Sequence, residues 1–337
     1  MKMAIYHGPK NIEIKEAPIP ECGENDVLIR NMYASICGSD VFAYANDGSA
    51  VHIWPEHEFG HEMVSRVEKV GDKVTDFKVG DIVYPYPMVA RGRENSATLG
   101  GFSEYILVKD AKIGQHLYKV DPAIDPKVAS MIEPFTVGTR AARRAEPKQG
   151  ESAIVFGAGA IGASAAIALK YFGCDKVMVV DFSDFRLNVL KNMGFYVCNP
   201  KTEDLKAKMI ETFGKSFGLG GETANVDIWI DAVGAKSVLD NYQAMAKVFN
   251  RMVIVGVHHE PRPVNLMLIT YGQGALIGSG GYMPEDVYDV MKIMASGEYD
   301  LASMITGVFD QDDICKAIET ATDSEHSFKC IIDYHVK

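Results

Sequence analysis

The sequence has 337 residues, of which 47% are hydrophobic, and a net charge of −11 at pH 7 with an isoelectric point near 5.3. That length accommodates two domains of ordinary size, and the hydrophobic content excludes a wholly disordered chain. The acidic balance argues against binding to nucleic acid or to an anionic membrane. Residues 1–8 have no apolar signal core, no run is long and apolar enough to span a bilayer, and the six scattered cysteines form no C-x-x-C pair. We therefore expect a cytoplasmic protein whose cysteines are thiols.

The first 136 residues are rich in short runs of alternating polarity, separated by turns that contain glycine. The clearest of these runs are 27–32, 63–70, 82–84 and 102–108. Many short strands with glycine turns favour a mainly antiparallel barrel or sandwich. Residues 84–101 are polar and rich in turn residues, which predicts a surface lobe or loop.

Strands and helices alternate from Glu151 onward. A helix over 127–144 leads into this region. The expected strands are 153–156, 177–180, 195–198, 226–230, 252–257 and 275–278, and the expected helices include 163–171, 186–193, 202–213 and 238–248. This alternation predicts an α/β domain with a doubly wound parallel sheet. The remaining elements are helices over 284–297 and 314–320 and a strand over 328–334, and we expect this end to pack back on the first domain.

A glycine-rich turn joins the strand 153–156 to the helix 163–171. Gly157, Gly159 and Gly162, with Ala160 and Ile161 between the last two, fit the pattern G-x-G-x-x-G. The first glycine allows a tight turn, the second lets the backbone approach a pyrophosphate, and the third lets helix and strand pack closely. The phosphates would lie at the helix N-terminus, where free N–H groups favour negative charge. The turn therefore predicts a dinucleotide site, with an ordinary α/β turn as the alternative.

Asp181 ends the next strand, about 20 residues after the turn, which is the spacing of an acid that binds adenosine ribose hydroxyls. A carboxylate there accepts hydrogen bonds from a free 2′-hydroxyl and repels a 2′-phosphate, so we expect NAD rather than NADP. Arg186 lies one helical turn further on, where it can stack near the adenine or pair with Asp181. The alternative for Asp181 is a helix N-cap or a loop acid. Val233, Val255 and Val257 follow later strands, and we expect them to line the cofactor site.

Three segments outside this region carry metal-ligand chemistry. They contain Cys37 followed by Ser39, His61 followed by Glu62, and Glu133. A thiolate, an imidazole and a carboxylate would bind zinc with a fourth position open, as in catalytic rather than structural sites. By spacing alone the site is only suggested, because a single cysteine such as Cys37 is more often a small buried residue and a lone histidine such as His61 more often a hydrogen-bonded structural one.

Taken with the glycine turn, these segments resemble the zinc-dependent medium-chain dehydrogenases. The branch they resemble contains sorbitol and other polyol, butanediol and threonine dehydrogenases. The resemblance covers essentially the whole chain and rests on the segments 36–40, 60–62, 67–71, 80–83, 100–105, 132–135 and 157–162. It implies a GroES-like catalytic domain over 1–136, a Rossmann domain inserted over 137–279, a return to the catalytic domain over 280–337, and an active-site cleft between the domains.

The resemblance also assigns roles to single residues. Cys37 and His61 match the first two catalytic zinc ligands, and Glu133 matches the third. Glu62 matches a glutamate beside the metal that ligates it directly in some relatives, so which carboxylate touches zinc stays open. Ser39 matches the hydroxyl that relays the substrate proton.

Val137 matches a residue that packs on the nicotinamide.

Three positions depart from the pattern of the family. Phe42 replaces a histidine that passes the proton onward, so the relay must end at the ribose hydroxyls, at water or at His52. Ser65 replaces a usual glycine. The lobe 84–99 contains no cysteine, whereas many relatives bind a structural zinc there with four cysteines. We therefore expect one zinc per chain and no structural zinc.

The segment 57–61, His-Glu-Phe-Gly-His, also matches the H-E-x-x-H motif of metalloproteases. That motif needs a helix to place both histidines on one face, and Pro55 and Gly60 disfavour a regular helix. A protease is therefore not expected.

The expected reaction moves a hydride between NAD(H) and the CH–OH or C=O group of a polyol, a sugar-derived alcohol or a small secondary alcohol. Zinc would acidify the hydroxyl, Ser39 would accept its proton, and the cofactor would carry the redox chemistry. The alternatives are a zinc-free quinone-type reductase and a non-catalytic dinucleotide-binding protein, and the retention of the zinc ligands and Ser39 argues against both. The family also implies a homodimer or homotetramer, in which the strand 275–278 extends its sheet across a two-fold axis.

Overall fold

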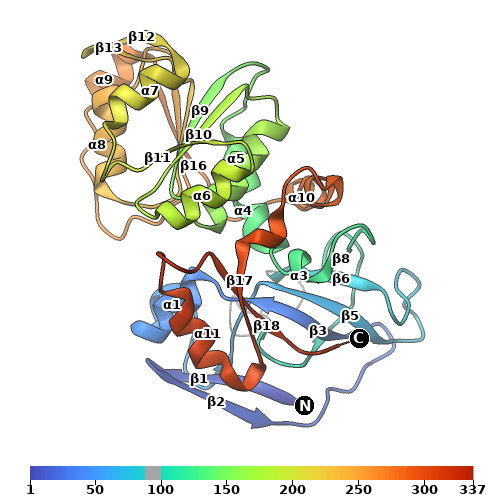
Figure 1. The fold of residues 1–337 in the computed structure, drawn as a ribbon. Coiled ribbons are helices and arrows are strands. Elements are labelled where there is room, and N and C mark those ends of the chain that lie inside the picture. Colours follow the sequence, from blue (N-terminus) through green and yellow to red (C-terminus); the bar gives the residue numbers. More distant parts are fainter. Residues whose placement is uncertain (88–99, 337) are drawn as a thin grey trace. The chain divides into compact units, whose positions relative to one another are not determined.

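The structure is a computed structural model and describes residues 1–87 and 100–336. These residues form two compact units, one made of 1–133 with 294–337 and the other made of 134–293 (Figure 1). The second unit is thus inserted between two parts of the first. The boundaries differ from those expected at 136/137 and 279/280, most of all at the later one.

Helix α10 (Pro284–Ser296) explains the later boundary. It was expected within the C-terminal return, but most of it belongs to the second unit. Its Asp286 and Asp289 form ion pairs with Arg143 of α4 (Ile132–Arg144), the Arg143 Nε to Asp286 Oδ1 distance being 2.7 Å. These charges hold α10 to α4, so the chain leaves the second unit only in the last turn of the helix.

The first unit is built mainly of antiparallel strands, as predicted. Its larger sheet has the order β17-β18-β3-β5-β6-β8, with β7 also paired to β3, and a smaller sheet has the order β2-β1-β4. Only β17 and β18 pair in parallel among the described strands of these two sheets. The strands are β1 (Lys2–Gly8), β2 (Asn11–Glu16), β3 (Val27–Ser35), β4 (His57–Glu58), β5 (Met63–Val70), β6 (Ile82–Pro85), β7 (Tyr105–Val108), β8 (Leu117–Lys119), β17 (Ile305–Phe309) and β18 (Lys329–Asp333).

Short helices cover this first unit. They are α1 (Gly38–Ala45), η1 (Gly48–Val51), α3 (Pro126–Ala129), η2 (Leu301–Met304), η3 (Gln311–Asp313) and α11 (Ile314–Ala321). The core includes three aromatic rings, with the Phe59 ring centroid 6.1 Å from that of Tyr6 and 4.9 Å from that of Phe102. This core fixes the segment around residues 59–62, which carries two of the predicted site residues.

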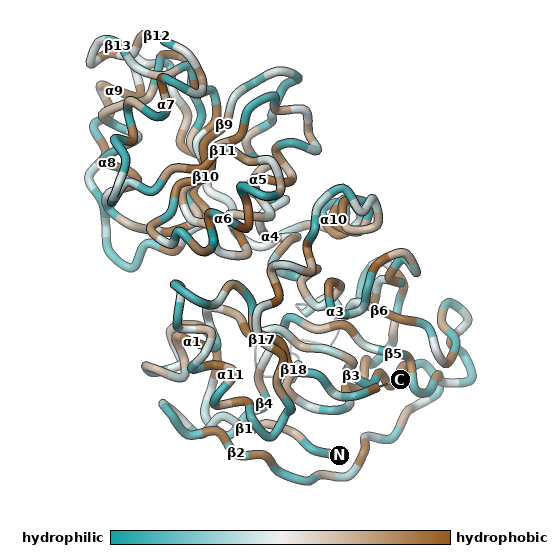
Figure 2. The backbone as a smooth tube through the Cα atoms, in the orientation of Figure 1, coloured by the Kyte–Doolittle hydropathy of each residue, from teal (hydrophilic) through white to brown (hydrophobic). Residues whose placement is uncertain are grey.

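The second unit is a parallel sheet of order β11-β10-β9-β14-β15-β16. Its strands are β9 (Ser152–Phe156), β10 (Lys176–Val180), β11 (Tyr196–Cys198), β14 (Ile228–Asp231), β15 (Arg251–Ile254) and β16 (Ala275–Gly278). Its helices, besides α4 and α10, are α5 (Ala160–Tyr171), α6 (Asp184–Asn192), α7 (Leu205–Phe213), α8 (Lys236–Met245) and α9 (Leu266–Gly272). The order reverses between β9 and β14, so the predicted doubly wound sheet is confirmed. The residues of β9 are buried throughout, and the strand carries hydrophobic colouring in Figure 2.

Several local expectations need correction. The helix expected over 127–144 is two helices, α3 and α4, separated at Ser130–Met131. The strand expected over 252–257 ends at Ile254, and its last residues form a loop. The sequence did not predict α1, α9 or the antiparallel hairpin of β12 (Lys215–Gly218) and β13 (Gly221–Ala224). Residues 88–99 of the predicted lobe lie outside the described part of the chain.

The sequence analysis expected neither a protease-like helix at residues 57–61 nor a membrane-spanning segment. His57 and Glu58 form strand β4, so the protease-like segment is not a helix. Among the described helices, none has both the length and the apolarity that crossing a bilayer requires.

Candidate metal and dinucleotide sites

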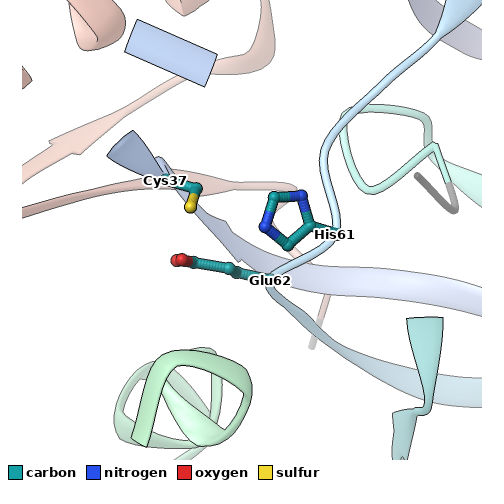
Figure 3. Close-up of side chains that lie close together, drawn as sticks. All are labelled: Cys37, His61 and Glu62. Atoms are coloured by element: carbon teal, nitrogen blue, oxygen red, sulfur yellow. The ribbon is translucent and has the colours of Figure 1, made fainter. Parts of the chain in front are cut away.

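Three of the predicted metal ligands lie together in the first unit. Cys37 follows β3 as the N-cap of α1, and His61 and Glu62 directly precede β5. β3 and β5 are antiparallel neighbours with Ala34 opposite Met63, so the end of one strand meets the start of the other. One ligand atom from each of the three side chains lies within 4.8 Å of the others, and the side chains converge in Figure 3. Sulfur, imidazole nitrogen and carboxylate oxygen are the donors that zinc takes in catalytic sites.

The backbone around these ligands has specific requirements. Gly60 has a φ of +88°, and a Cβ at this position would lie 2.7 Å from the Phe102 ring. Glycine is therefore needed for the turn that presents His61. On the other side, the backbone N–H of Cys37 donates to Asp40 Oδ2 at 2.8 Å. Asp40 is buried, and burial raises its pKa to about 6.

Glu62 is held by two buried partners that the sequence analysis missed. Its Oε2 accepts a hydrogen bond from Ser35 Oγ and forms an ion pair with Lys329 Nζ from β18. Lys329 also donates to the carbonyl oxygen of Ile36 at 2.8 Å. Glu62 is 1% exposed and Lys329 6% exposed. The only sequence signal for this pair was one lysine at the start of an apolar strand.

The charges of this pair stabilise each other in the interior. Burial alone would raise the pKa of Glu62, but Lys329 and His61 outweigh it and lower that pKa. Burial would lower the pKa of Lys329, but Glu62 and Cys37 outweigh it and raise that pKa. Glu62 is therefore a carboxylate with its countercharge in place.

The fourth predicted ligand, Glu133, is not part of the converging group. It lies buried in the first turn of α4. It does act electrostatically on the group: burial lowers the pKa of His61, but the charges of Cys37 and Glu133 help to raise it well above its usual value. Burial and the charge of Glu62 raise the pKa of the Cys37 thiol.

Ser39 lies in the first turn of α1, two residues after Cys37. Its hydroxyl oxygen is buried and has no hydrogen-bond partner among the described residues. A buried hydroxyl without a protein partner is uncommon and calls for an explanation such as a ligand. His52, one proposed end of the proton relay, is exposed after η1.

The glycine turn of the second unit has the geometry that its sequence predicts. Gly157 has a φ of +103°, and a Cβ there would lie 3.0 Å from Val233 Cγ2. A Cβ on Gly162 would lie 1.8 Å from the carbonyl oxygen of Gly157, so this glycine allows α5 to pack against the turn. Gly159 is the N-cap of α5, and a Cβ on it would meet nothing within 4 Å. The backbone at Gly159 is thus open to a ligand, as phosphate binding at a helix N-terminus requires.

Asp181 lies next to this turn. Its Oδ2 accepts from the backbone N–H of Ala158 at 2.6 Å, and its Oδ1 accepts from that of Ser183 at 2.8 Å. Ser183, rather than Asp181, caps helix α6 by accepting from the backbone N–H of Arg186. The other predicted cofactor residues are half-buried or exposed: Val137, Ala160, Ile161, Arg186, Val233, Val255 and Val257.

Comparison with known proteins matches both units. Residues 23–119 match the family described as alcohol dehydrogenase GroES-like domain, and residues 160–296 match zinc-binding dehydrogenase. L-galactonate-5-dehydrogenase of Escherichia coli (strain K12) is 30% identical over 324 residues, which cover 91% of each chain. Sorbitol dehydrogenase of Bacillus subtilis is 28% identical over 346 residues, which cover 95% of this chain and 93% of the relative.

Solved structures share the fold along their whole length. The structure of 2R,3R-butanediol dehydrogenase from Bacillus subtilis superposes with a TM-score of 0.84 at 24% identity, covering 98% of this chain and 99% of its own. An alcohol dehydrogenase from Escherichia coli CFT073, complexed with NADH, superposes with a TM-score of 0.84 at 25% identity, covering 99% of both chains. The resemblance read from the motifs is confirmed: the chain belongs to the zinc-type medium-chain dehydrogenases and is an oxidoreductase acting on CH–OH donors.

Proposed function

We propose that the protein is a zinc- and NAD-dependent dehydrogenase of a polyol, a sugar-derived alcohol or a small secondary alcohol. The observation that carries this proposal is the convergence of Cys37, His61 and Glu62 in a chain that also has the glycine turn. The substrate class is supported by relatives named for sorbitol and L-galactonate, which are both polyhydroxylated molecules.

The metal centre would use Cys37, His61 and Glu62 as its protein ligands. Glu62 is favoured over Glu133 because it belongs to the converging group and Glu133 does not. A zinc ion bound there supplies Lewis acidity, which makes a substrate hydroxyl more acidic. Lys329 and Ser35 hold the orientation of Glu62, as outer partners of metal ligands commonly do.

Ser39 is the proposed first acceptor of the substrate proton. Its buried hydroxyl has no hydrogen-bond partner among residues 1–87 and 100–336 and is two residues from Cys37, so it is available to a substrate bound at the metal centre. Phe42 cannot pass the proton onward, so the relay continues through a cofactor ribose hydroxyl, water or His52.

The cofactor would bind at the glycine turn, with its pyrophosphate at Gly159 and the N-terminus of α5. Asp181 supports NAD over NADP, because its carboxylate beside the turn repels a 2′-phosphate. Steady-state kinetics with both cofactors test this choice, and a strong preference for NADP would contradict it.

The absence of cysteine from 84–99 supports a single zinc per chain, and metal analysis that finds two tightly bound zinc ions would overturn that number.

The substitution Cys37→Ser tests the metal role. We expect loss of bound zinc and a fall in turnover of at least about 10³-fold, since the thiolate ligand is removed. NADH binding, measured by calorimetry, should stay within about twofold of the wild type, because the glycine turn is untouched. Cys22→Ser, outside the cluster, is the matched control. If the Cys37 variant keeps most of its turnover, the zinc mechanism is wrong.

A further inference from the structure

A buried aspartate joins two loops of the second unit. Asp231 ends β14 and is 0% exposed. Its Oδ1 accepts from the backbone N–H groups of Val233 at 2.9 Å and Gly234 at 2.8 Å, which belong to the loop after β14. Its Oδ2 lies 2.8 Å from Nε2 of His258, which follows β15. One carboxylate therefore fixes both loops.

The two loops also pack backbone against backbone. A Cβ on Gly234 would lie 2.2 Å from the carbonyl oxygen of Val257, and a Cβ on Gly256 would lie 2.2 Å from the nitrogen of Gly234. The backbone N–H groups of Val255 and Gly256 donate to the carbonyl oxygen of Asp231 at 2.9 and 2.8 Å. A shift of either loop therefore moves the other.

The hydrogen bond to Asp231 fixes the orientation of the imidazole. A carboxylate only accepts, so Nε2 of His258 carries the proton that is donated to Asp231. Nδ1 is buried and has no hydrogen-bond partner among the described residues. Within the part of the chain that the structure describes, Asp231 is the hydrogen-bond partner of the His258 side chain.

The position of these loops in the sheet indicates what they face. The glycine turn follows β9, and Asp181 follows β10 on one side of it, where the adenosine ribose binds. β14 and β15 lie on the other side of β9, so the second nucleotide of a dinucleotide extends toward their loops. Val233 is 50% exposed and Val257 69% exposed, which leaves two apolar side chains for a flat ring to cover.

We propose that His258 is a positioning residue for the nicotinamide half of the cofactor. Through Asp231 it holds the loop Val255–His258, so that Val233 and Val257 are placed to pack on the nicotinamide. His258 does not act on the reacting atoms. This inference rests on the proposed function, because it assumes that the glycine turn binds NAD(H).

The test compares two ligands that differ at one end. NADH carries the nicotinamide, whereas ADP-ribose has the same adenosine, pyrophosphate and second ribose without it. In His258→Leu we expect NADH to bind about tenfold more weakly, since a hydrogen bond to a charged group is lost. ADP-ribose should bind within about twofold of the wild type. His258→Gln retains a donor near the position of Nε2, and it should restore most of the NADH affinity.

Two further variants provide a replacement for His258→Leu and a control. His258→Asn keeps a polar side chain but is too short to donate from the Nε2 position, so it should behave like His258→Leu and replaces it if that variant does not fold. His259→Leu alters the neighbouring exposed residue and serves as a control. Equal loss of both ligands, unchanged NADH binding, or failure of His258→Gln to rescue would each overturn the positioning role. Failure of the wild type to bind either ligand would instead refute the proposed function.

Discussion

Lys329 places a full positive charge in the interior, where it is 6% exposed against the 1% exposed Glu62. Neither charge is tolerated there alone, because an unpaired buried ion has lost its water without compensation. The pair therefore makes the last strand of the first unit part of the candidate metal centre, although Glu62 and Lys329 lie far apart in the sequence.

Replacing Lys329 by methionine should lower the free energy of unfolding of the metal-free protein by about 3–5 kcal/mol, because Glu62 loses its countercharge. The double variant Lys329→Met with Glu62→Gln removes both charges and should recover most of that loss. Denaturant unfolding in the presence of a chelator measures both. Lys2→Met is the control, because the Lys2–Asp312 pair is exposed and contributes little. Equal destabilisation in the single and double variants would contradict the pairing.

At the residue scale, the sequence predicted the site residues that belong to known motifs. It missed the residues whose role depends on contacts with distant parts of the chain. Cys37, His61 and Glu62 were named because their order and chemistry follow a family pattern, and the structure brings them together. Glu133 was named for the same reason, yet it lies outside the group. Lys329 and His258 could not be found, since their partners come from other strands and no local pattern links them.

Among the elements, the turn between β9 and α5 shows how three glycines serve three purposes. Gly157 supplies a positive φ, Gly162 supplies close packing, and Gly159 leaves an open helix N-terminus. Substitution of Gly162 should therefore lower the stability of the protein. Substitution of Gly159 should instead weaken ligand binding and leave the stability nearly unchanged.

Gly162→Ala places a methyl group 1.8 Å from the carbonyl oxygen of Gly157 and should lower the free energy of unfolding by about 1–3 kcal/mol. Gly159→Ala meets nothing within 4 Å at a φ of −72°, so stability should be nearly unchanged. Its methyl group occupies the approach of the pyrophosphate, and NADH should bind at least about tenfold more weakly. Thermal unfolding and calorimetry separate the two effects. Wild-type NADH affinity in Gly159→Ala would show that the pyrophosphate lies elsewhere.

Elements with strong periodicity were predictable, and their ends were less so. The strands of the parallel sheet are short apolar runs bounded by turn residues, and each expected strand was found. The break between α3 and α4 was missed although Pro134 marks it: a proline has no N–H to donate to the carbonyl oxygen of Ser130, so one helix cannot run through that turn. The hairpin of β12 and β13 was missed because its strands have the sequences KSFG and GETA, which show no alternation of apolar and polar residues.

For the molecule as a whole, one sheet edge is suited to self-association. β16 is the last strand of the parallel sheet among those described, and its free edge can pair with another strand. The preceding helix α9 exposes Leu266, Met267 and Tyr271 at 70%, 57% and 70%. An exposed strand edge beside exposed apolar side chains is typical of an interface, and a two-fold axis would close it.

We expect a dimer, or a dimer of dimers, that forms through β16 and α9. Light scattering of the wild type should give a multiple of the 36.9 kDa chain mass. Leu266→Lys combined with Tyr271→Lys should shift the protein toward the monomer, because charges cannot be buried at an apolar interface. Val79→Lys alters a valine that is 62% exposed in the first unit and should not change the mass. A monomeric wild type would contradict the prediction.

The order of synthesis follows from the inserted arrangement of the two units. The second unit is one uninterrupted segment, 134–293, whereas the first needs residues 294–337 to be complete. Until β18 is made, Tyr33–Ser35 of β3 lack the strand neighbour on one edge, and Glu62 lacks its cation. Domains fold as units while the chain emerges, and unpaired strand edges are prone to aggregate. The first unit therefore keeps an unpaired edge on β3 until β18 emerges, and Glu62 gains its countercharge only at that point.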